Sequence, residues 1–182
     1  MKGLVFTEFL NQVEEQFGLE TLDKVLYSSN LNLKSGGVYT AVGTYPHSEL
    51  IGLVQELSKE AKIPVPELLK SFGKYLFTVF EKNYGSLFLS IRTSLDLLEK
   101  VESYIHVEVQ KLYPDAELPT LEKSRISENC LLMVYKSNRR LADFAEGLIL
   151  GCAEYFGERL SIIKEDLSNG EGREVKFTIS KI

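Results

Sequence analysis

The stretch Ile105-His106-Val107-Glu108-Val109-Gln110-Lys111-Leu112-Tyr113-Pro114 marks the point where the chain changes character. Apolar residues before it recur at three- and four-residue steps, which is typical of amphipathic helices. Pro114 ends the last of these helices, because proline lacks the backbone N–H that a helix interior needs. Beyond Pro114, short apolar runs bounded by turn residues predict strands. This order predicts an α+β fold, in which helices precede a small antiparallel sheet with one helix packed on it.

Five helices are expected before Pro114. Ser48 and Ser94 suit the N-caps of the third and fifth helices, and Pro66 suits the first turn of the fourth. The predicted ranges are 2–17, 20–28, 48–62, 66–83 and 94–113.

The length of 182 residues allows one core in two lobes. We therefore expect a single domain over 1–182, with a helical lobe at about 1–65 and a lobe of helices and sheet at about 66–182. In the second lobe, strands are predicted at 131–135, 160–163 and 175–179, and a helix at 141–156.

Composition narrows the class of protein. The net charge of −5 argues against a nucleic-acid binder, and no apolar run is long enough to span a membrane. Glu8 comes too early for a signal peptide, so a cytoplasmic location is expected. Cys130 and Cys152 have no CxxC partner and are expected to be buried, unreactive thiols.

Three polar residues mark the end of the 131–135 strand. Strand alternation predicts that Tyr135, Ser137 and Arg139 share one face, spaced by about 6.6 Å. Two hydroxyls and a guanidinium suit the oxygens of a carboxylate or a phosphate. A solvated strand end with a basic flank fits the same pattern.

His106 lies in the last helix before Pro114, just outside its apolar stripe. A neutral imidazole is a common metal ligand, although a half-buried surface histidine fits the position as well. No set of His, Cys or carboxylate residues has zinc-binding spacing. A haem needs only one ligand from the protein, so a haem pocket is compatible with these residues. The apolar stripe comprises Leu97, Leu98, Val101, Ile105, Val109 and Leu112.

A combination of motifs resembles the haem–nitric oxide/oxygen binding (H-NOX) family, which is related to the sensor region of soluble guanylate cyclase. These motifs are the Tyr135-x-Ser137-x-Arg139 triplet, His106 located 29 positions before Tyr135, the Met1-Lys2-Gly3 start and the segment Leu112–Pro119. The resemblance covers essentially the whole chain and implies a haem between the two lobes.

The resemblance also implies roles for individual residues. His106 would be the proximal ligand of the iron in a haem b (iron protoporphyrin IX), and Tyr135, Ser137 and Arg139 would bind the propionates. Pro119, 13 residues after His106, would press on the porphyrin. Apolar residues that would line the haem are Val5, Phe9, Phe80, Phe144 and Leu148. Core packing alone would equally explain Val5, Phe80 and Leu148.

The residues expected on the distal side of the haem, opposite His106 and facing the gas, indicate which gas binds. Family members that bind oxygen stably have a tyrosine, a tryptophan and an asparagine where this chain has Phe144, Phe9 and Leu76. None of the three can donate a hydrogen bond to dioxygen, whereas NO and CO need no such donor. The sequence therefore favours an NO sensor that excludes oxygen.

The remaining expectations concern what accompanies the sensor. The resemblance implies that some members have a structural zinc site of cysteines and a histidine near the C-terminus. No zinc is expected in this chain, because it has no cysteine beyond Cys152. No catalytic activity is expected, since the chain ends at Ile182 without an output domain. The implied partner is a separate histidine kinase or cyclic-di-GMP enzyme. An oxygen sensor and a haem-free helical interaction module are the alternatives.

Overall fold

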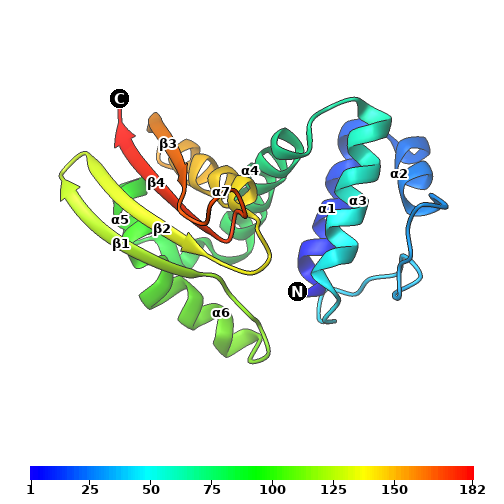
Figure 1. The fold of residues 1–182 in the computed structure, drawn as a ribbon. Helices are drawn as coiled ribbons and strands as arrows, with labels where there is room; N and C mark the ends of the chain where they lie inside the picture. The colour runs from blue at the N-terminus through cyan, green and yellow to red at the C-terminus, as the bar shows by residue number, and fades with distance from the viewer. The chain divides into compact units, whose positions relative to one another are not determined.

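A computed structural model describes residues 1–182 as two compact units, Met1–Phe72 and Gly73–Ile182. Figure 1 shows their elements. The helices are α1 (Gly3–Phe17), α2 (Leu19–Leu26), α3 (His47–Ala61), α4 (Val65–Tyr84), the 3₁₀ helix η1 (Gly85–Phe88), α5 (Ser94–Lys100), the π-helical turn η2 (Val101–Ile105), α6 (His106–Leu112) and α7 (Ala142–Tyr155). The strands are β1 (Thr120–Ser127), β2 (Cys130–Lys136), β3 (Leu160–Asp166) and β4 (Glu174–Lys181).

In the N-terminal unit, α1, α2 and α3 pack together and a long irregular segment joins α2 to α3. Two buried carboxylates of α3, Glu49 and Glu56, hold this segment. Glu49 accepts hydrogen bonds from the hydroxyls of Ser35 (2.6 Å) and Tyr39 (2.8 Å). The Tyr39 ring stacks on Phe6 of α1 with 4.5 Å between centroids. The segment is therefore fixed by buried polar contacts although it has almost no regular secondary structure.

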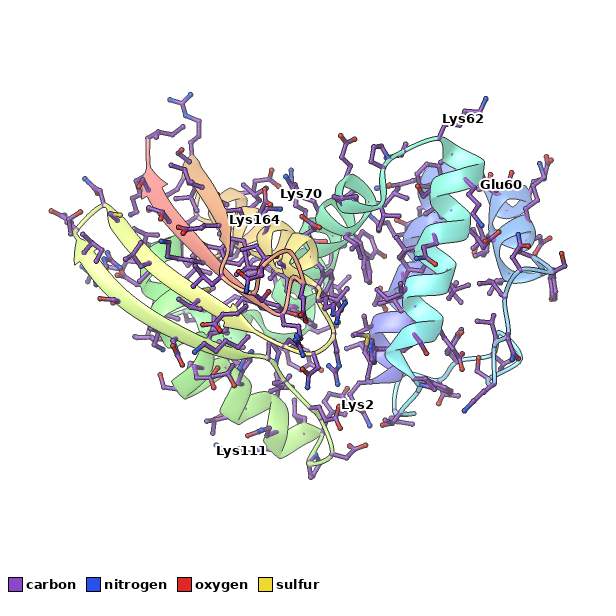
Figure 2. The ribbon with its side chains drawn as sticks, in the orientation of Figure 1. Lys2, Glu60, Lys62, Lys70, Lys111 and Lys164 are labelled. Atoms are coloured by element: carbon purple, nitrogen blue, oxygen red, sulfur yellow. The ribbon has the colours of Figure 1, made fainter.

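The C-terminal unit contains a four-stranded antiparallel sheet in the order β1-β2-β4-β3. Its helices α5 and α7 lie on one face of this sheet, as Figure 1 shows. The side chains that point to this face form the core together with Leu95 of α5 and Ile149 of α7. Lys164 of β3 pairs with Asp143 and with Glu146 (2.7 Å), and so links that strand to α7 (Figure 2).

The predicted α+β fold class is confirmed, and so are the three predicted strands. The first strand, β1, was not predicted. It is an edge strand whose core-side positions include Lys123 and Arg125, so the apolar alternation that identifies a strand is missing. Both cations reach Glu99 of α5, the lysine at its carbonyl oxygen and the arginine at its carboxylate.

Two predicted N-caps are wrong by one or two residues. Thr93, not Ser94, caps α5, because the hydroxyl of Thr93 accepts a hydrogen bond from the Asp96 N–H. The third helix begins at His47 after Pro46, which leaves Ser48 inside the first turn. Of the two predicted buried thiols, Cys152 is buried and Cys130 is half-buried.

The helix predicted over 94–113 is interrupted by the π turn η2. The N–H of His106 donates to the carbonyl of Val101, five residues back, instead of four. One extra residue in a turn rotates everything after it, so the apolar stripe does not continue in phase. Leu112, predicted to lie in the stripe, is 57% exposed.

Glycines bring α4 and α7 close together. A Cβ added at Gly73 of α4 would lie 2.2 Å from the carbonyl oxygen of Phe144, and one at Gly151 of α7 would lie 2.7 Å from Cβ of Phe77. Any larger residue at either position would push the two helices apart. No helix of the structure is long and apolar enough to cross a membrane.

Candidate haem site

His106 is the first residue of α6, directly after the π turn. Its side chain is 14% exposed, and its Nδ1 lies 3.0 Å from Oε2 of Glu102. A carboxylate only accepts hydrogen bonds, so Nδ1 carries the proton and Nε2 carries the lone pair in the neutral ring. Nε2 has no hydrogen-bond partner in the protein. Burial lowers the pKa of His106, which favours the neutral form that binds metals.

Glu102 also ties the His106 helix to the sheet. The same Oε2 atom accepts a hydrogen bond from the backbone N–H of Leu121 in β1 (3.2 Å). Sequence reasoning did not single out Glu102. The signal that could have found it is the four-residue spacing to His106, which places both side chains on one face of a helix.

The residues of the Tyr135-x-Ser137-x-Arg139 motif are arranged differently from the prediction. Strand β2 ends at Lys136, so strand alternation does not position Arg139. A turn over Ser137–Arg140 follows, closed by the Arg140 N–H on the Ser137 carbonyl. The motif is thus a strand end and a turn rather than one face of a strand.

The two hydroxyls of the motif each accept a backbone hydrogen bond. The Leu141 N–H donates to the Tyr135 hydroxyl (3.1 Å), and the Arg139 N–H donates to the Ser137 hydroxyl (3.2 Å). Each hydroxyl therefore keeps its own proton for donation to a further acceptor. Tyr135 is only 3% exposed, so its hydroxyl is held in place by the core.

Arg139 already holds a carboxylate. Its guanidinium donates to Oε2 of Glu117 (2.8 Å) and to the carbonyl oxygen of Glu117 (2.7 Å). The arginine side chain is 15% exposed and that of Glu117 is 86% exposed. The guanidinium is thus mostly buried and held by two hydrogen bonds, whereas the carboxylate that it binds is exposed to solvent. Sequence reasoning missed Glu117, which no spacing rule connects to Arg139.

The sheet register brings these groups together within the C-terminal unit. Leu121 pairs with Tyr135 and Thr120 pairs with Lys136, so the chain just before Thr120 runs alongside the turn after Lys136. Glu102 ties His106 to Leu121, and Arg139 reaches back to Glu117. Pro119 lies between these two attachment points. His106, Pro119 and the motif are therefore neighbours at one end of the β1–β2 pair.

The predicted apolar lining residues fall in both units. Phe80 of α4 and Phe144 and Leu148 of α7 belong to the C-terminal unit and are half-buried, as is Pro119. Phe144 and Leu148 are four residues apart and share a face of α7. Val5 and Phe9 lie on α1 of the N-terminal unit, where the Phe9 ring packs edge-on against Phe72 at 5.2 Å.

The donor groups fit a haem. One imidazole offers an unpartnered Nε2, and two hydroxyls and a guanidinium suit the propionate carboxylates. No group of three or more His, Cys, Asp or Glu side chains could hold a metal ion by itself. In the β3–β4 turn, Asp166 accepts hydrogen bonds from the Ser168 hydroxyl and the Gly172 N–H.

Comparison with known proteins identifies the class. The family model for haem-NO-binding domains matches residues 2–164. The Fe(II) unliganded H-NOX protein of K. algicida is 42% identical, with a TM-score of 0.94 over 100% of this chain and 97% of that one. The IWP-051-bound H-NOX of Shewanella woodyi in the Fe(II)CO state is 43% identical, with a TM-score of 0.83 over 100% and 95%.

An H-NOX protein of S. oneidensis in the Fe(II)NO state is 26% identical, with a TM-score of 0.89 over 100% of this chain and 99% of that one. No curated protein matches the chain. Fold and matches together define a haem-binding gas-sensor domain. The chain belongs to the haem-NO-binding, or H-NOX, family.

Proposed function

We propose that this protein is a haem-based NO sensor in which Nε2 of His106 holds the iron. The observation that carries this proposal is the state of His106: Nδ1 is held by Glu102, and Nε2 is left without a partner. A bound ferrous haem b supplies the open coordination position at which NO, and also CO, binds. The Fe(II)NO and Fe(II)CO states of the S. oneidensis and S. woodyi proteins support both ligands.

The propionates are assigned to Tyr135, Ser137 and Arg139. The two hydroxyls donate the protons that their backbone contacts leave available, and Arg139 exchanges its exposed Glu117 partner for a propionate. Pro119 presses on the porphyrin from the chain segment beside the motif. The apolar lining is assigned to Val5, Phe9, Phe80, Phe144 and Leu148.

Oxygen is excluded because the distal side lacks a hydrogen-bond donor. Phe144, Phe9 and Leu76 have apolar side chains and cannot stabilise the partial negative charge of bound dioxygen. Phe144→Tyr, which adds one hydroxyl, should make oxygen binding to the ferrous protein detectable. A stable oxygen complex of the unmodified protein in air would overturn this part of the proposal.

The proposed signal starts at His106, which would hold the iron and which Glu102 attaches to Leu121 of β1. His106 would hold the iron and Pro119 would contact the porphyrin, so a haem that binds NO would act on the protein through these two residues, with His106 either attached to the iron or released from it. NO can shift the protein only by its differential affinity for the two arrangements. We propose that a separate cytoplasmic protein, a histidine kinase or a cyclic-di-GMP enzyme, responds, and that the domain itself is not catalytic.

The direct test is the visible absorption spectrum of the purified protein with haem supplied. We expect a Soret band for the ferrous protein that shifts when NO is added and stays unchanged in air. A protein that remains colourless after haem is supplied would instead support a haem-free interaction module.

A further inference from the structure

Glu102 is the residue beside the proposed iron ligand whose role is not yet accounted for. Its Oε2 atom accepts the Nδ1 proton of His106 at 3.0 Å and the backbone N–H of Leu121 at 3.2 Å. A backbone donor fixes the carboxylate much better than solvent does. The carboxylate therefore stays beside the imidazole although the Glu102 side chain is 40% exposed.

The charged pair between Glu20 and Lys24 differs from this one. Glu20 and Lys24 on α2 are also four residues apart and form a salt bridge, but their side chains are 84% and 53% exposed. Such a pair contributes little, because solvent screens it and both side chains lose freedom. Glu102 instead connects a half-buried ring to a strand across the π turn.

A carboxylate that accepts the Nδ1 proton has two effects on an imidazole. It selects the tautomer with the lone pair on Nε2, and it draws the Nδ1 proton away so that Nε2 becomes a stronger donor to a metal. Partners of this kind commonly change metal affinity or activity by about 10–100-fold when they are removed.

We propose that Glu102 is a positioning residue that sets the strength of the His106–iron bond, and with it the ease with which NO releases His106. This inference rests on the proposed function. Glu102 orients the Nε2 lone pair and strengthens it, and it keeps the ring attached to β1 after release. The threshold of the sensor is then set by a carboxylate that acts through its hydrogen bond to His106.

Two substitutions separate charge from mere attachment. Glu102→Gln keeps an oxygen that can accept hydrogen bonds from His106 and Leu121 but removes the charge. Glu102→Ala removes the accepting oxygen as well as the charge. Glu108→Gln is the matched control, because Glu108 is a helix carboxylate two residues after His106 that pairs with Lys111 instead (2.6 Å). Lys111 lies near the end of that helix, as Figure 2 shows.

The first readout is the iron–histidine stretching frequency of the ferrous protein by resonance Raman spectroscopy. The second is the rate at which His106 is released after NO is added, followed at the Soret band. We expect Glu102→Gln to lower the frequency and to speed release by about tenfold, and Glu102→Ala to do more. Glu108→Gln should leave both unchanged.

A purely structural role of Glu102 would give a different result. If Glu102 only attached α6 to β1, Glu102→Gln would leave the stretching frequency and the release rate at their original values, and this result would overturn the inference. A wild-type protein with no iron–histidine mode would contradict the proposed function instead. In that case ¹⁵N NMR of His106 without haem still decides the positioning role. The Nδ1–H tautomer should predominate in the wild type and be lost in Glu102→Ala, and an unchanged tautomer would overturn it.

Discussion

The buried carboxylates of the N-terminal unit and the candidate site of the C-terminal unit differ in how completely their polar groups are paired. In the N-terminal unit, the buried carboxylate of Glu49 accepts hydrogen bonds from Ser35 and Tyr39. Glu56 accepts from Ser28 at 2.8 Å and from Asn30 at 3.2 Å. These groups meet the usual requirement that buried polar atoms find partners inside the protein.

The candidate site of the C-terminal unit leaves hydrogen-bonding capacity unused. Nε2 of His106 has no partner, the hydroxyls of Tyr135 and Ser137 keep a proton to donate, and Arg139 holds an exposed carboxylate. A fully paired carboxylate stabilises the fold, whereas a polar group with an unused donor or acceptor can still bind a further group. The comparison thus separates carboxylates that are fully paired within the fold from the polar residues that the proposed function assigns to haem binding.

Removing His106 should have the largest effect on the binding side of this comparison. His106→Gly deletes the only proposed protein ligand of the iron, so we expect the ferrous Soret spectrum to change completely and to be restored by added imidazole. Folding should be retained, because the ring is not part of the central core. His47→Gln, which replaces the other histidine, should leave the ferrous Soret spectrum unchanged. An unchanged ferrous spectrum of His106→Gly without imidazole would show that the ligand is assigned wrongly.

Glu49→Ala tests the stability side. The substitution leaves the hydroxyls of Ser35 and Tyr39 without their shared acceptor, which should lower the free energy of unfolding by about 3 kcal/mol. Urea unfolding of the haem-free protein measures this loss. Glu60→Ala is the control, since Glu60 is exposed on the same helix (Figure 2). Equal stabilities of the two variants would contradict the role given to the buried carboxylate.

Arg139→Ala should have an intermediate effect, on haem retention alone. A charge-assisted hydrogen bond to a propionate is worth about 1.5–3 kcal/mol, which corresponds to roughly ten- to hundredfold faster haem loss. Transfer of haem to an acceptor protein measures the rate. Arg140→Ala is the matched control, because the Arg140 side chain is 57% exposed and lies 3.8 Å from its partner Glu171. Similar rates for both variants would refute the assignment of Arg139.

Much of the fold could be predicted from the sequence because helical and strand periods are local. The π turn could not, since no residue type requires it; it is visible only as the carbonyl of Val101 accepting from an N–H five residues on. Strand β1 could not be predicted because Lys123 and Arg125 occupy core-side positions that are apolar in an ordinary half-buried strand. Both failures come from contacts between elements, which single-sequence periodicity does not contain.

The candidate site was predicted through the family resemblance, and periodicity alone left His106 an ordinary helix residue. The resemblance supplied the residue types but not their connections. The bonds from Glu102 to Leu121 and from Arg139 to Glu117 join residues 19 and 22 positions apart. Such pairs become neighbours only when the sheet forms, so no local pattern could have indicated them.

The smallest expected effect concerns pH and the pairing of Glu56. Hydrogen bonds from Lys59, Ser28 and Asn30 lower the pKa of Glu56 from 4.5 to about 2. A carboxylate with a lowered pKa in the folded state stabilises the fold above its unfolded pKa, and this contribution is lost as the pH falls through 4.5 towards 2.

Glu56→Gln has no charge to lose. The difference in urea midpoint between wild type and Glu56→Gln should therefore be constant from pH 7 to about 5 and then shrink towards pH 3. A difference in urea midpoint that stays constant down to pH 3 would mean that the charge of Glu56 does not contribute to the stability of the fold.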